Sequence, residues 1–248
     1  MRPTTTQRLR YRLWSAPTTP RRLDRALLLL GSFKQLGWFD SANGSGPVDA
    51  NGNPLPWYTY PAIYWLESIL TGRERVFEYG SGNSTRWFAR RVKSVVAVEH
   101  DESWVNKVRA LVPGNVTLQF VPPLKGDAPE QRYGPYVSAI TGQDEAGFDI
   151  VVVDGEARNA CCELALPYLQ PGGLLILDNS DRPEFEPANT FLLGQGFARI
   201  DFVGPVPGDV GWSSTSVYSR DFSGWTRRTP LPTAHTKKVR QFRTLPRH

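Results

Sequence analysis

From residue 76 onward, short apolar segments rich in β-branched residues alternate with segments in which apolar residues recur every three or four positions. The first pattern predicts buried strands, and the second predicts helices with one apolar face. Strands are expected at 76–78, 94–99, 116–120, 148–155, 174–179, 198–202 and 214–219. Helices are expected at 84–92, 101–111, 158–169 and 188–193, with Pro171-Gly172-Gly173 turning the chain before the next strand.

Regular alternation of strands and helices predicts an α/β fold with a doubly wound, mostly parallel sheet and right-handed crossovers. The last two of the seven expected strands have no helix between them, only a Gly- and Pro-rich loop at 204–211. We therefore expect them to form an antiparallel hairpin, so that the final strand runs against the rest of the sheet.

Before residue 76 the pattern predicts two helices and an irregular connection. Residues 23–36 read as one amphipathic helix ended by Gly37, and 41–56 are dense in Gly, Asn and Pro and read as a loop. Thr59 or Tyr60 then precedes a helix with Pro61 in its first turn and apolar residues on one face. With 248 residues, 40% of them hydrophobic, the chain predicts one domain at 57–222, flanked by a basic segment at 1–56 and a basic tail at 223–248.

The net charge of +5 is unevenly distributed along the chain. Residues 1–25 hold seven Arg and one Asp, and residues 227–248 hold seven Lys or Arg and no acid, so the remainder carries 15 bases against 23 acids. Basic ends can meet an anionic partner, but an acidic body disfavours specific nucleic-acid binding.

No apolar run is long enough to span a membrane, so we expect a cytoplasmic protein, although residues 1–22 also resemble a transit peptide. Cys161 and Cys162 are adjacent and lack metal-ligand spacing, so we expect both to be buried on a helix.

The first strand ends in a turn that marks a ligand site. Gly80 and Gly82 let the backbone turn sharply and approach a ligand closely. A dinucleotide fingerprint would need a third glycine at 85, where Thr85 stands, and Glu78 suits a ligand with a positive group better than a diphosphate. A nicotinamide oxidoreductase is therefore disfavoured.

Glu78-Tyr79-Gly80-Ser81-Gly82 resembles motif I of class I methyltransferases that use S-adenosylmethionine (SAM). Further likeness lies at Glu99, at Asp154, at 169–173 and in the expected terminal hairpin, and it covers about residues 60–220. The resemblance implies that Glu99 binds the ribose hydroxyls. It assigns the rest of the cofactor side to Glu78, Gly80, Gly82, Ser84 and His100, with Glu78 facing the ammonium group. The adenine contact stays open among Val121, Lys125 and Asp127.

Asp154, Asp178 and Asn179 resemble the set that holds Mg²⁺ in catechol-type O-methyltransferases. Hard oxygen ligands suit Mg²⁺ and would activate a bound hydroxyl, so Asp154 is expected to be a base or a metal ligand. The pattern departs where that family has a lysine, because Ala157 stands there. Arg158 follows it as a catalytic candidate, but a guanidinium stays protonated and cannot act as a base.

These features predict a SAM-dependent methyltransferase acting, at oxygen, on a small-molecule or glycan-type acceptor. Stacking surfaces and hydrogen-bond donors for such an acceptor are expected at Tyr58, Tyr60, Arg132, Tyr133, Tyr136, Arg158, Arg182 and Trp212. The alternative is a non-catalytic module of the same fold that docks through its basic ends to an anionic partner. Oligomeric state is not readable from the sequence.

Overall fold

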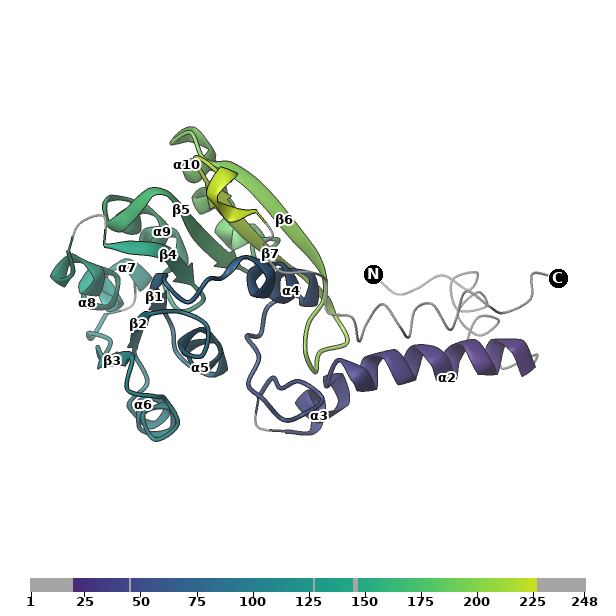
Figure 1. Cartoon of the computed structure of the whole chain (residues 1–248). Coiled ribbons are helices and arrows are strands. Elements are labelled where there is room, and N and C mark those ends of the chain that lie inside the picture. The colour runs from purple at the N-terminus through teal and green to yellow at the C-terminus, as the bar shows by residue number, and fades with distance from the viewer. Residues whose placement is uncertain (1–19, 45, 127, 145–146, 227–248) are drawn as a thin grey trace.

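The computed structural model describes residues 20–44, 46–126, 128–144 and 147–226 (Figure 1). Its centre is a seven-stranded sheet with the order β3-β2-β1-β4-β5-β7-β6. The strands are β1 (Arg75–Tyr79), β2 (Ser94–Glu99), β3 (Val116–Phe120), β4 (Phe148–Val153), β5 (Leu169–Asp178), β6 (Ala198–Pro205) and β7 (Trp212–Ser219). The first five pair in parallel, and β7 runs antiparallel to both β5 and β6. The predicted fold class is confirmed.

The helices are α2 (Pro20–Gln35), α3 (Trp38–Asn43), α4 (Tyr60–Ile69), α5 (Asn83–Ala89), α6 (Glu102–Arg109), α7 (Pro129–Arg132), α8 (Gly134–Val137), α9 (Arg158–Ala165) and α10 (Glu186–Gly194). Two of them begin as the sequence predicts. The Thr59 side chain accepts a hydrogen bond from the Ala62 amide at the start of α4, and Asp101 accepts one from the Trp104 amide at the start of α6. Such caps satisfy amide groups that a helix end leaves unpaired.

The sheet separates two apolar cores. Successive residues of a strand point to opposite faces, so on β4 Ile150 and Val152 enter one core while Val151 and Val153 enter the other. The first core packs α4 and α5 against the sheet, and the second packs α8, α9 and α10. Cys161 and Cys162 are fully buried on α9 as free thiols, as predicted.

Three local predictions were wrong. Pro171-Gly172-Gly173 does not turn the chain but lies inside β5, where Gly172 takes a left-handed φ of 72° and the register with β4 shifts. The expected loop at 41–56 begins inside α3, which follows the left-handed Gly37. Leu111 lies beyond α6 and is 55% exposed, because α6 ends at Arg109 and Pro113 follows closely.

Helix α2 extends away from the sheet (Figure 1), and its residues Leu27, Leu28, Leu29 and Leu30 are exposed. Of the basic segments predicted at the two ends, residues 1–19 and 227–248 lie outside the described residues. Within the part of the chain that the structure describes, no helix is long and apolar enough to cross a membrane.

Candidate functional site

The register of the parallel strands brings the predicted site residues to one edge. Tyr79 of β1 pairs with Val98 of β2 and Val153 of β4, and Val153 pairs in turn with Leu177 of β5. The residue after each of these strand positions was predicted from the sequence: Gly80, Glu99, Asp154 and Asp178. They lie where the strand order reverses between β1 and its two neighbours, and open α/β sheets bind ligands at that point.

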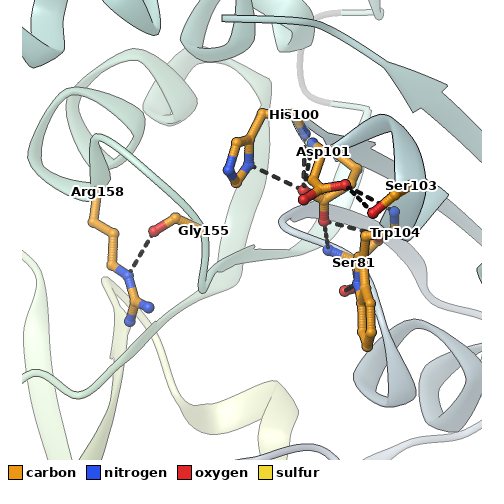
Figure 2. Close-up of polar contacts among 8 residues, drawn as sticks. Ser81, His100, Asp101, Ser103, Trp104, Gly155 and Arg158 are labelled. Atoms are coloured by element: carbon orange, nitrogen blue, oxygen red, sulfur yellow. Dashed lines mark hydrogen bonds and ion pairs between the residues drawn. The ribbon is translucent and has the colours of Figure 1, made fainter.

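The turn after β1 requires glycine at position 80. Gly80 has a φ of 95°, and a Cβ there would lie 3.1 Å from the Asp154 carbonyl oxygen. A Cβ on Gly82 would lie 3.5 Å from the Trp104 ring, whose Nε1 donates to the Ser81 carbonyl at 2.7 Å (Figure 2). Trp104, on α6, is 38% exposed and braces this turn.

Glu99 is buried and its carboxylate is held by four short contacts. Oε2 accepts hydrogen bonds from the Ser81 amide and hydroxyl, each at 3.0 Å. Oε1 accepts from the amides of His100 and Asp101 at 2.8 and 3.2 Å (Figure 2). His100 Nδ1 lies 3.0 Å from Oε1 but makes no hydrogen bond. Backbone donors therefore fix the carboxylate beside the glycine turn, with the movable Ser81 hydroxyl and His100 ring at its edge.

Glu78 is buried with one carboxylate oxygen left unpartnered. Its Oε2 accepts from the Thr85 hydroxyl, which itself accepts from the Gly82 amide at 2.9 Å. Oε1 has no hydrogen-bond partner. Burial raises the Glu78 pKa to about 8, while the nearby hydroxyls of Ser84 and Thr85 oppose the shift. Thr85, which breaks the dinucleotide fingerprint, thus ties Glu78 to the turn, and Ser84 lies close to the same carboxylate.

The insertion between β3 and β4 covers this edge with aromatic rings. The His100 ring lies edge-on to Tyr133 and Tyr136, with centroids 5.5 and 5.9 Å away. The Tyr136 hydroxyl is buried without a hydrogen-bond partner, and it lies only 2.0 Å from where a Cβ on Gly155 would stand. Of the open adenine candidates, Val121 donates its amide to the Glu99 carbonyl, Lys125 is exposed, and Asp127 lies outside the described residues.

Arg158, the first residue of α9, lies at the centre of the other half of the edge. Its Nη2 is 3.1 Å from Asp154 Oδ1 and its Nη1 donates to Asn179 Oδ1 at 3.3 Å. Nη1 also donates to the Asp178 carbonyl at 2.6 Å, and Nε donates to the Gly155 carbonyl at 2.9 Å (Figure 2). The structure thus brings together all four residues predicted for catalysis or metal binding, around one guanidinium.

The two aspartates of this group differ in their surroundings. Burial raises the Asp154 pKa, while Arg158 and Arg182 oppose the shift. Burial and then the charge of Asp154 raise the Asp178 pKa, against hydrogen bonding from Thr215. The Thr215 hydroxyl donates to Asp178 Oδ1 at 2.6 Å and accepts from the Thr59 amide at 3.1 Å. Asp178 is therefore tied into the packing of β7 and the segment before α4, a contact that the sequence pattern did not reveal.

Tyr58 is an aromatic candidate for the acceptor side whose pKa is affected by these acids. It is fully buried, and its hydroxyl has no hydrogen-bond partner. Burial raises its pKa first, and the charges of Asp154, Glu78 and Asp178 raise it further. Other acceptor-side candidates lie differently: the Tyr60 hydroxyl donates to the Leu36 carbonyl at 3.3 Å, and Trp212 is 75% exposed.

Comparison with known proteins found one matching family and several solved structures of similar fold. Residues 77–180 match the family described as "Methyltransferase domain". An O-methyltransferase from Bacillus cereus, solved with S-adenosylhomocysteine, superposes with a TM-score of 0.50 at 16% identity, over 85% of this chain and 95% of that one. An rRNA methylase from Streptococcus thermophilus superposes at 0.46 with 16% identity, over 64% and 94%.

A precorrin-6y C5,15-methyltransferase from Geobacter metallireducens superposes at 0.46 with 15% identity, over 64% of this chain and 85% of that one. No curated protein sequence matches this chain. The matched segment runs from β1 to the residues just after β5, and it includes every strand end that contributes to the candidate site. Residues 77–180 therefore resemble a methyltransferase domain, and the seven-stranded sheet that contains them has the α/β methyltransferase fold.

Proposed function

We propose that this chain transfers a methyl group from SAM to an oxygen atom of a small-molecule acceptor. The match to a methyltransferase domain and the likeness to an O-methyltransferase solved with S-adenosylhomocysteine support the proposal. In this assignment Glu78, Gly80, Gly82, Ser84, Glu99 and His100 form the cofactor side, and Asp154 and Arg158 form the side of the acceptor.

The unpartnered oxygen of Glu78 is the observation that carries the proposal. A buried carboxyl without a partner costs free energy unless it stays protonated or meets a cation. Glu78 Oε1 is buried without a hydrogen-bond partner, and Glu99, at the end of β2, accepts from the Ser81 hydroxyl, an exchangeable donor. The ammonium group of SAM would supply the missing cation, and a ribose would take over the place of the Ser81 hydroxyl on Glu99.

Bound SAM supplies a methyl group on a sulfonium, and transfer needs the acceptor oxygen held in line at about 3 Å. The protein contributes alignment and a proton acceptor. Asp154 suits the second task, because burial raises its pKa and so strengthens it as a base. Arg158 holds Asp154 Oδ1 at 3.1 Å and fixes its orientation.

The acceptor is proposed to be a small hydroxylated molecule. Tyr58 offers a buried hydroxyl with no protein partner beside the acids. Arg182 is exposed near Asp154 and could meet an anionic group on the acceptor. A phenol or a sugar could pack against the apolar ring of Tyr58, bond to its hydroxyl and place an anionic substituent near Arg182.

Calorimetry with S-adenosylhomocysteine tests the proposal without knowledge of the acceptor. The native chain should bind one molecule, and Glu99→Ala should weaken binding about tenfold to a hundredfold, because hydrogen bonds to a charged group contribute about 1.5–3 kcal/mol. Glu163→Gln, an exposed change on α9, is the matched control and should bind like the native chain. If the native chain shows no binding, or if Glu99→Ala leaves it unchanged, the proposed function is wrong.

A further inference from the structure

The oxygens expected to bind Mg²⁺ already surround a positive charge. Arg158 contacts the side chains of Asp154 and Asn179 and the backbone carbonyls of Gly155 and Asp178. The guanidinium also lies over the Phe185 ring, with 5.0 Å to its centroid, and the Arg158 side chain is only 11% exposed. These contacts use three nitrogens of one planar group, which is the geometry in which arginine binds several oxygens at once.

Two residues next to the Arg158 guanidinium have an unusual backbone conformation. Ala157, immediately before Arg158, has a φ of 47°, and Asn179 has a φ of 51°. Among the described residues these are the non-glycine positions with positive φ. Such conformations persist where the surrounding structure enforces them, and they gather at functional sites. Ala157 precedes Arg158 in the chain, and Asn179 accepts a hydrogen bond from its guanidinium.

While Arg158 stands among them, these oxygens suit a divalent cation poorly. Mg²⁺ requires six oxygens in a near-octahedral shell at about 2.0–2.1 Å and usually keeps several waters. Asp178 is 3% exposed, and its Oδ1 accepts from the Thr215 hydroxyl. Asn179 Nδ2 donates to the Ser213 hydroxyl at 3.1 Å, which fixes the orientation of the amide. A metal ion would in addition stand beside a permanently charged guanidinium, and like charges repel strongly in a partly buried site.

We propose that Arg158 is the resident cation of this site and takes the place that a divalent metal would occupy between Asp154 and Asn179. Methyl transfer by this chain then requires no metal. Arg158 acts as a positioning residue, because it holds the Asp154 carboxylate toward the acceptor side. The inference rests on the proposed function for its catalytic meaning, but the occupancy of the site is measurable without any acceptor.

Binding of Mn²⁺, followed by electron paramagnetic resonance of the full chain, tests the proposal with Mn²⁺ alone as the probe. The native protein should bind no more Mn²⁺ than Asp154→Asn does. Arg158→Ala removes the repelling guanidinium and leaves the oxygens, so it should bind Mn²⁺ at least about tenfold more tightly than the native chain. The gain should disappear in the double variant Arg158→Ala with Asp154→Asn.

Two further variants separate the guanidinium from the general charge of the region. Arg158→Lys keeps the positive charge and should stay without Mn²⁺. Arg182→Ala removes a nearby exposed charge outside the ligand set and should also behave like the native chain. Binding of S-adenosylhomocysteine, measured on each variant, reports on the cofactor side and on folding, and its absence from the native chain would count against the proposed function alone.

Three results would overturn the proposal. The first is one Mn²⁺ per native chain that Asp154→Asn loses. The second is an Arg158→Ala protein that still binds S-adenosylhomocysteine but gains no Mn²⁺. The third is an equal gain in Arg182→Ala, which would show that overall charge, and not the place of Arg158, controls access of the metal.

Discussion

At the scale of single residues, the buried acids of this edge are stabilised to different degrees. Glu99 is held by four donors, Asp178 by Thr215 and Asp154 by Arg158, whereas Glu78 keeps one oxygen unpartnered. A charge that lacks partners is costly in a buried place, and the cost appears as a raised pKa. Glu78 is thus the acid of this edge whose buried carboxyl has an oxygen without a partner and a pKa raised to about 8.

We predict that Glu78→Gln stabilises the ligand-free protein at high pH. The Glu78 pKa is about 8 in the folded chain against an ordinary value of 4.5, so folding favours the protonated form. The carboxyl costs nothing extra below pH 4.5, and its cost grows as the pH rises toward 8 and is full above it. Each pKa unit corresponds to about 1.4 kcal/mol.

Thermal unfolding at pH 5 and pH 9 measures this effect. The advantage of Glu78→Gln over the native chain should be larger at pH 9 than at pH 5, whereas binding of S-adenosylhomocysteine should weaken. An advantage that is equal at both pH values would show that the Glu78 carboxyl titrates normally.

We predict that Thr215→Val destabilises the protein by about 1–3 kcal/mol, because a buried acceptor that loses its donor costs that much. The change removes the hydroxyl that donates to Asp178 and the acceptor of the Thr59 amide. Urea unfolding measures the difference. Thr117→Val, at an exposed position of β3, is the matched control and should be neutral within about 0.5 kcal/mol. Equal effects at the two positions would assign the loss to the strand and not to Asp178.

At the scale of elements, the insertion between β3 and β4 is anchored on the turn after β4. Helix α8 places the Tyr136 hydroxyl against Gly155, and the rings of Tyr133 and Tyr136 meet His100. A segment that looks irregular in sequence therefore packs against His100 and the turn after β4 at the candidate site. This packing depends on Gly155, because a side chain there would clash with the Tyr136 hydroxyl.

We predict that Gly155→Ala destabilises the protein by about 1–3 kcal/mol, the usual cost of an extra methyl group in a packed interior. A Cβ there would lie 2.0 Å from the Tyr136 hydroxyl and 3.0 Å from the Gly80 amide nitrogen. Tyr136→Phe should be neutral or stabilising alone, because it deletes a buried hydroxyl without a partner.

A double-mutant cycle by chemical denaturation separates the two contacts of Gly155. Tyr136→Phe should recover part of the loss caused by Gly155→Ala, which is the signature of residues in direct contact. If the two effects are simply additive, the clash is with the Gly80 backbone and not with Tyr136.

At the scale of the whole molecule, a compact acidic body carries basic ends. Helix α2 extends away from the sheet and exposes its leucines (Figure 1), so it contributes little to the two cores. The site residues all lie on the sheet edge, and the basic segments at 1–25 and 227–248 lie outside it in sequence. Cofactor binding and partner docking should therefore be separable.

We predict that a chain shortened to residues 32–226 binds S-adenosylhomocysteine as the full chain does. Its midpoint of thermal unfolding should move by no more than about 2–4 °C, the shift that corresponds to about 1 kcal/mol at this size. Calorimetry and a thermal scan of both chains measure the two quantities. Loss of cofactor binding on truncation would show that the ends complete the site and would favour a function in which docking and binding are coupled.

The sequence by itself determined the order of elements and the positions of the strand ends. Apolar runs of β-branched residues, the glycine pair at 80 and 82 and the caps at Thr59 and Asp101 are local signals, and the structure confirms the elements that they predicted. Pro171-Gly172-Gly173 misled because glycine permits a bulge within a strand as readily as a turn.

Only the tertiary structure decided which partners the site residues have. Contacts such as Ser81 with Glu99, Trp104 with the glycine turn and Thr215 with Asp178 join segments far apart in the chain. No local pattern encodes them, because they depend on strand register and on how loops pack over the sheet edge. For the same reason the sequence could name Asp154, Arg158, Asp178 and Asn179, but only the fold brought the guanidinium of Arg158 among the oxygens of the others.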